Sequence, residues 1–282
     1  MQIFLNRTLK EKIIHETAVL LFFPNGQIRR IIKEEIKGGE SMSKALIVNA
    51  DDFGFSEAVN YGILKGIEEG IVTSTTIMAN MPGFDHAVKL YQSHEGLCVG
   101  VHLNLTCYKP LLKTHKTLVD ENGYFRKQGE IDVYDEEEMY QELCAQIERT
   151  LEADISIDHL DSHHHIHTTE KLKPVIDRLY EKYGYPMRGG FVYERKIPQS
   201  NLIMEFYDEG VTLEEFERIV KQLKDGEVYD LMCHPAYVDQ FLYKTTSYAL
   251  KRIEELDLLC HKEIKACLMR HDIRLCSYKD VK

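Results

Sequence analysis

From Lys44 onward, short apolar runs alternate with longer stretches in which apolar residues recur every three or four positions. The first pattern is typical of buried strands, and the second of helices that cover a sheet. Strands are predicted over 45–50, 72–78, 97–105, 156–163, 187–188, 229–233 and 274–278, and helices over 57–70, 84–93, 136–151, 170–183, 212–223 and 250–270. This α/β alternation predicts a parallel sheet, either an irregular (β/α) barrel or an open doubly wound sheet.

The first 41 residues lack this alternation and show only a weak helical period. The residues just before Met42, Lys37 to Ser41, can be encoded by a purine-rich run of the ribosome-binding-site type. We therefore expect Met42 to be the native start, with residues 1–41 as an N-terminal leader outside the protein proper. A real, partly helical N-terminal arm is the alternative. Residues 42–282 are expected to form a single (β/α) barrel domain.

Polar residues gather where the predicted strands end. Asp51 and Asp52 follow the first strand in NADDFG, and His102 lies on the third in GVHLNLT. His163 ends the strand of HLDSHHHIH, and His234 follows the strand of MCHPA. The carboxyl ends of parallel strands share one edge of the sheet, which is where active sites lie in both candidate architectures. We expect these side chains to form one site there.

The residue types at this edge indicate a metal-dependent hydrolase. Taken singly, paired aspartates are often a turn or a helix cap, and a strand histidine is often a packed core residue. Four imidazoles within 163–167 are harder to bury without a metal, because each ring carries two polar nitrogens. One Asp and two His suit a divalent ion that keeps positions open for water and substrate. Asp51 is then available to accept a proton from water, and His234 to protonate a leaving group.

Composition excludes several classes of partner and compartment. Lys and Arg total 35 against 46 Asp and Glu, a formal charge of -11 without a basic run, so nucleic acid is not an expected partner. The apolar stretch 18–23 is too short for a membrane span and lacks the features of a signal peptide. Seven cysteines without a C-x-x-C pair indicate reduced thiols, and we predict a cytoplasmic protein. The sequence contains no glycine-rich phosphate loop, which disfavours a nucleotide-binding site.

Five motifs in this order, LIVNADDFG, GIVTSTTIMAN, GVHLNLT, HLDSHHHIH and MCHPA, resemble the YdjC-like carbohydrate deacetylases over about residues 44–282. The resemblance implies an irregular, TIM-barrel-like (β/α) barrel with its metal site at the C-terminal ends of the strands. It also implies N-deacetylation of acetylated oligosaccharides, one divalent ion that is magnesium in the family, and a homodimer. The leader before Met42 is a departure from the family pattern.

The resemblance also implies a role for each motif residue. It implies that Asp52, His102 and His163 are metal ligands and that Asp51 is the base. Similarity to the wider polysaccharide-deacetylase group implies that His234 is the acid. The same group implies that Asp161 orients an imidazole and that Arg188 pairs with Asp51. The ligand chemistry itself favours zinc or another transition metal over magnesium, which prefers an oxygen shell. One divalent ion is therefore predicted, and its identity stays open.

Three functions are compatible with these residues. The first is removal of an acetyl group from short, chitobiose-like N-acetylated oligosaccharides during carbohydrate degradation. The second is a metallohydrolase that acts on another small amide or ester, and the third is a non-catalytic sugar- or metal-binding protein. For the first, loop 108–134 is the expected lid over the barrel mouth, with rings for sugar stacking at Tyr108, Tyr124, Phe125 and Tyr134.

Overall fold

The computed structural model describes residues 18–22, 28–32 and 44–281, and the chain divides into two compact units, 1–41 and 42–282. In the first unit, β1 (Ala18–Phe22) pairs antiparallel with β2 (Ile28–Ile32). The described part of this unit is therefore strand and not the helix expected for an N-terminal arm, in keeping with its β-branched Val and Ile content. The proposed start at Met42 lies outside the described residues.

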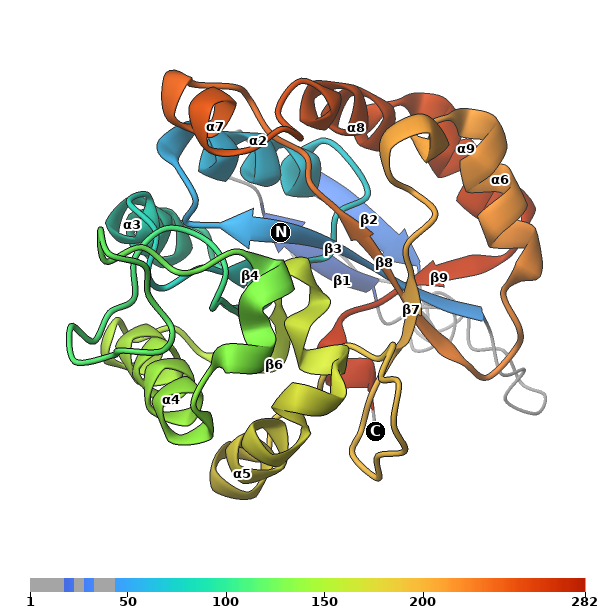
Figure 1. Cartoon of the computed structure of the whole chain (residues 1–282). Coiled ribbons are helices and arrows are strands. Elements are labelled where there is room, and N and C mark those ends of the chain that lie inside the picture. Colours follow the sequence, from blue (N-terminus) through green and yellow to red (C-terminus); the bar gives the residue numbers. More distant parts are fainter. Residues whose placement is uncertain (1–17, 23–27, 33–43, 282) are drawn as a thin grey trace, which may run out of the picture. The chain divides into compact units, whose positions relative to one another are not determined.

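The second unit is built around a parallel sheet (Figure 1). Its strands are β3 (Lys44–Phe53), β4 (Ser74–Ile77), β5 (Val99–Leu103), β6 (Ile157–Ser162), β7 (Asn201–Ile203), β8 (Val228–Cys233) and β9 (Ile273–Leu275). They run in the order β6-β5-β4-β3-β8-β7, and β9 pairs with the start of β3. Strand β3 lies mid-sheet, so its carboxyl end faces the middle of the site.

A single residue links the two outer strands of this order. Met187 forms parallel bridges to Leu160 of β6 and to Gln199, which lies just before β7. The Arg188 amide donates to the Leu160 carbonyl (3.0 Å), and the Met187 amide to the Pro198 carbonyl (3.0 Å). The strand predicted over 187–188 is thus reduced to one bridging residue. The sheet is curled in a barrel-like α/β fold, and the open doubly wound alternative was wrong.

Helices cover the outside of the curled sheet (Figure 1). They are α2 (Glu57–Glu68), α3 (Phe84–Ser93), α4 (Glu136–Glu152), α5 (Lys173–Tyr183), α6 (Leu213–Gln222), α7 (Gln240–Thr245), α8 (Lys251–Cys260) and α9 (Lys262–Arg270). The prediction of one helix over 250–270 was wrong. His261 is extended and caps α9, because its ring nitrogen accepts the Glu263 amide (3.3 Å).

Two apolar clusters fill the space between sheet and helices. The larger packs β3, β4 and β8 against α2, α6 and α9, and the second packs β5 and β6 against α4 and α5. The side of the sheet that faces the site carries buried polar residues instead: Asn49, Asp51, Thr76, His102, Asp161, Arg188 and Asp230. The seven cysteines all lie in the described residues and are unpaired. None of the described helices is both long and apolar enough to cross a membrane.

Candidate active site

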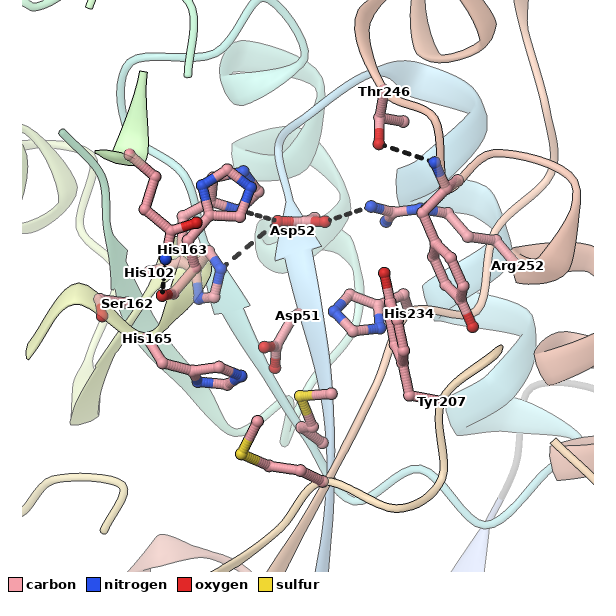
Figure 2. A pocket seen from close by; sticks show the side chains of 15 residues that line it. Asp51, Asp52, His102, Ser162, His163, His165, Tyr207, His234, Thr246 and Arg252 are labelled. Carbon is pink, nitrogen blue, oxygen red and sulfur yellow. Dashed lines mark hydrogen bonds and ion pairs between the residues drawn. The ribbon is translucent and has the colours of Figure 1, made fainter. Parts of the chain in front are cut away.

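Asp51 and Asp52 both line one cavity of about 300 Å³ at the carboxyl end of β3, although consecutive strand residues normally face opposite ways (Figure 2). Two local features break the alternation. Asp52 has a left-handed backbone with φ 72°, a conformation that Asp tolerates better than most residues. The register of β3 against β4 also shifts between Ala50 and Phe53. This strand end therefore delivers two neighbouring carboxylates to one site.

Asp52, His102 and His163 converge on a common point. Asp52 Oδ1 lies 3.4 Å from His102 Nε2 and 3.2 Å from His163 Nδ1, and one atom of each residue lies within 4.8 Å of the others. The three residues come from the ends of β3, β5 and β6. Asp52 Oδ1 is buried and accepts no hydrogen bond from the described residues, so it presents an oxygen beside two ring nitrogens. This donor set fits a divalent ion.

Asp161 contacts the ring of His102 on the side away from Asp52. His102 Nδ1 lies 2.7 Å from Asp161 Oδ1, which turns Nε2 toward Asp52. Asp161 Oδ2 accepts in turn from Thr76 Oγ1 at 3.0 Å. Burial lowers the pKa of His102, but Asp161, Asp51 and Asp52 together raise that pKa to about 9. The site therefore draws positive charge to His102 Nε2, and a carboxylate behind a histidine is a common support for a metal ligand.

Arg188 is fully buried beneath the cavity and holds Asp51. Its Nη1 and Nη2 each donate to one oxygen of Asp51 at 2.7 Å, and its Nε donates to Asp230 at 2.8 Å. Asn49 Nδ2 also donates to Asp51 Oδ1 (2.9 Å). Burial raises the pKa of Asp51, but Arg188 outweighs that effect and holds the pKa well below its usual range. Asp51 is thus fixed as a carboxylate, with one of about four acceptor positions left for a water molecule.

The buried charges around this point do not balance. The acidic groups are Asp51, Asp52, Asp161, Asp230 and Glu255, and the basic groups are Arg188, Arg252 and, because its pKa is raised to about 9, His102. The five carboxylates outnumber the three basic groups, so negative charge is in excess around this point and a bound cation would reduce it. Buried charge without a partner is costly, so the imbalance is independent support for a cation in this site.

His234 lies just past β8, across the cavity from His163 (Figure 2). Its Nδ1 is 3.6 Å from Glu255 Oε1, and its backbone amide donates to the same carboxylate. Its ring meets the rings of Tyr207 and Tyr248 edge-on, with centroids 5.7 Å apart in each case. The carboxylate behind Nδ1 leaves Nε2 as the nitrogen that can serve a substrate.

The segment after His234 is fixed by close packing against α2. A Cβ at Gly62 would lie 2.4 Å from Ala236 Cα and 2.6 Å from the Tyr237 nitrogen. Only glycine lets the helix approach the backbone this closely.

Arg252 and Glu255 are site residues that the sequence reasoning missed. Arg252 Nη2 donates to Asp52 Oδ2 at 2.7 Å, and Glu255 supports His234. Both are buried on the inner face of α8, one helical turn before Leu256 and Leu259. A signal was present: positions 252, 255, 256 and 259 form a helical stripe in which two of the four inward positions are charged. Charged residues at stripe positions are seldom buried without a partner.

Of the histidine run, only the ring of His163 belongs to the candidate ligand cluster with Asp52 and His102. His164 and His165 have left-handed backbones and line the cavity, and His164 Nδ1 is 2.9 Å from Thr106 Oγ1. His167 is buried, with its ring nitrogens near Ser162 Oγ and the Arg188 carbonyl. Burial lowers the pKa of His164 to about 3, of His165 to about 4 and of His167 to about 3. These three rings are therefore neutral.

The aromatic rings expected in loop 108–134 do not line the cavity. Phe125 and Tyr134 are buried in the second apolar cluster, where the Tyr134 hydroxyl donates to the Leu105 carbonyl (3.1 Å). Tyr108 packs against Tyr124 and Phe241. These rings pack because the loop is tied to α4 by carboxylates that accept its backbone amides. The cavity's aromatic wall consists instead of Tyr207 and Tyr248, and Gln128 is the residue that this loop contributes.

Comparison with known proteins finds relatives that match most of the chain. A carbohydrate deacetylase of Geobacillus stearothermophilus is 39% identical over 242 residues, covering 85% of this chain and 98% of that protein. A carbohydrate deacetylase of Halalkalibacterium halodurans is 42% identical over 227 residues, covering 76% of this chain and 94% of that protein.

A solved structure is also similar. It is a proposed cellobiose-phosphate cleavage protein of Enterococcus faecalis V583, with a TM-score of 0.79, 34% identity and coverage of 84% of this chain and 98% of that one. The model of the YdjC-like proteins matches residues 45–270, which contain every site residue named above. The chain therefore belongs to the YdjC-like protein family.

Proposed function

We propose that this protein is a metal-dependent carbohydrate deacetylase that removes an acetyl group from a short N-acetylated oligosaccharide. The observation that carries the proposal is the free, buried Asp52 Oδ1 beside His102 and His163, in the same cavity as Asp51 and His234. Those residues supply every group that amide hydrolysis needs. The relatives named carbohydrate deacetylase support the same assignment.

The residues divide the reaction between the two sides of the cavity. Asp52, His102 and His163 would hold the divalent ion, whose chemistry is to polarise the acetamide carbonyl and to acidify water. Asp51 accepts the proton of the attacking water, and Arg188 keeps that carboxylate in place. His234, with Glu255 behind its Nδ1, gives a proton to the departing amine. Cleavage of the C–N bond then yields acetate and the free amino sugar.

Cavity size and lining support a short substrate. A volume of about 300 Å³ lies at the lower end of the range for ligand pockets and suits one or two sugar rings better than a polymer. Tyr207 is stacked on Tyr248 with ring centroids 4.1 Å apart, and it stays 41% exposed at the rim. Sugar faces pack on such rings. The magnesium ion and the homodimer implied by the resemblance, and the cytoplasmic location predicted from composition, stay predictions.

Acetate release tests this function directly. Protein loaded with Zn²⁺, Mn²⁺ or Mg²⁺ is incubated with the mono-, di- and trisaccharides of N-acetylglucosamine and with insoluble chitin, and acetate is quantified. We expect one acetate per disaccharide and little from chitin. Faster release from chitin would contradict the pocket argument. Turnover of other acetylated amides or esters, but of none of these sugars, would favour the broader metallohydrolase. Ion binding without any turnover would favour a non-catalytic binding protein.

Replacement of Tyr207 should weaken substrate binding more than chemistry. In Tyr207→Ala a sugar ring loses a stacking surface worth about 1 kcal/mol, so KM should rise about 3- to 10-fold while kcat changes little. Tyr124→Ala is the matched control, because Tyr124 is also 41% exposed but lies outside the cavity. Steady-state kinetics on the disaccharide distinguish the two. Equal KM values for both variants would remove Tyr207 from sugar recognition.

A further inference from the structure

We propose that Arg252 is a positioning residue that sets how Asp52 presents its carboxylate to the ion. This inference rests on the metal site of the proposed function and adds a residue to it. Arg252 lies 200 positions after Asp52 in the sequence, on a helix outside the sheet, and reaches the site from the side opposite the two histidines (Figure 2).

The two oxygens of Asp52 have separate partners. Oδ1 faces His102 Nε2 and His163 Nδ1 and accepts no hydrogen bond within the described part of the chain, whereas Oδ2 accepts from Arg252 Nη2 at 2.7 Å. A carboxylate free of such a partner can bind an ion through both oxygens. With Oδ2 engaged, Asp52 contributes one oxygen, and a coordination position stays open for water or the acetamide carbonyl.

Arginine suits this position because it makes two directed contacts at once. Its Nε donates to the Tyr248 carbonyl at 2.8 Å, and Tyr248 in turn donates through its hydroxyl to Glu255 at 2.6 Å. The side chain of Arg252 is 4% exposed, and its guanidinium lies 5.9 Å from the ring centroids of Phe55 and Tyr248. The guanidinium plane is therefore fixed from the helix side, and the direction of the bond to Asp52 is fixed with it. A lysine amine cannot reproduce both contacts in this geometry.

A guanidinium close to a divalent ion also repels it, so two effects of opposite sign compete. If orientation of Asp52 dominates, removal of Arg252 weakens ion binding. If repulsion dominates, removal strengthens ion binding. Supporting partners of metal ligands typically contribute 10- to 100-fold in affinity, which is why we expect orientation to dominate.

The experiment compares ion affinity in four proteins. Zn²⁺ affinity is measured by competition with a chromophoric chelator for the wild type, Arg252→Met, Arg252→Gln and the control Arg270→Met, whose side chain is exposed on α9. Gln keeps a donor for Asp52 without the charge. The absorption spectrum of the Co²⁺-loaded proteins reports coordination, and far-ultraviolet circular dichroism reports folding.

We expect Zn²⁺ affinity to fall about 10- to 100-fold in Arg252→Met and by less in Arg252→Gln. The Co²⁺ spectrum should change in Arg252→Met. Arg270→Met should keep the wild-type affinity and spectrum. Folded Arg252 variants that bind Zn²⁺ as tightly as the wild type, or more tightly, would overturn the proposal. If Arg252→Met does not fold, Arg252→Leu takes its place, because leucine also lacks a donor for Asp52, and unchanged affinity and spectrum in that folded variant count equally against the proposal. A wild-type protein that binds no divalent ion would instead refute the proposed function itself.

Discussion

His163→Ala should lose its bound ion and with it at least about 10³-fold in kcat/KM. The loss follows because three protein ligands leave no redundancy, and because a metal that polarises a carbonyl contributes several kcal/mol to the transition state. Among the three ligands His163 gives the cleanest test. Asp52→Ala would leave Arg252 without its buried partner, and His102→Ala would take the imidazole from Asp161, so both disturb the buried charges. Among the described carboxylates and guanidinium groups, His163 forms an ion pair only with Asp52.

The adjacent histidine provides the control. His164 has its ring centroid 4.0 Å from that of His163 and lines the same cavity, but it stands outside the ligand cluster. His164→Ala should therefore retain one equivalent of ion by elemental analysis after dialysis against buffer without metal. His163→Ala that retained a full equivalent and normal turnover would show that the ligand assignment is wrong. Asp52→Ala and His102→Ala should also lose the ion.

Asp51→Asn should keep the ion and lose about 10² to 10⁴ in kcat. The amide has the shape of the carboxylate and still accepts a hydrogen bond from Arg188, but it cannot take a proton from water. KM should change little, because the cavity wall is unaltered. The measurement is kcat and KM on the disaccharide together with ion content, in parallel with the wild type.

Asp230→Asn separates proton acceptance from the loss of charge. Asp230 pairs with the same guanidinium, through Arg188 Nε at 2.8 Å, but it is buried and does not line the cavity. Both substitutions remove one negative charge from Arg188, so a much smaller loss of kcat in Asp230→Asn is expected. Equal losses in the two variants would mean that the charge around Arg188, and not a base at Asp51, limits the reaction.

The strand-and-helix pattern predicted most of the fold because each βα unit is encoded locally, by apolar runs and amphipathic stripes. Site residues at strand ends were predictable for the same reason, since parallel strands place their carboxyl ends at one edge. The pattern marked 187–188 as a short strand but did not decide between a barrel and an open sheet, because a single residue, Met187, makes both bridges to the outer strands. The break at His261 was missed because apolar residues continue on both sides of it.

Long-range partners account for what the sequence did not predict about the site. Arg252 is remote in sequence from Asp52, and no local motif joins Glu255 to His234. Exposure is likewise a tertiary property. Tyr134 and Tyr207 are both tyrosines between predicted elements, yet the first is 2% exposed within packed residues and the second 41% exposed at the cavity. Only packing of the loops on α4 and α8 determines which ring a sugar can reach.

Gly62 limits how this protein can evolve, although it touches neither the cavity nor any group of the reaction. A glycine inside a helix costs roughly 1 kcal/mol of stability relative to alanine, so helix propensity alone predicts that Gly62→Ala is stabilising. The added carbon would press on the backbone of Ala236, two residues after His234, and so would displace His234. Redesign of α2 for stability should keep glycine at this position, because the gain in helix propensity would be accompanied by displacement of the His234 imidazole.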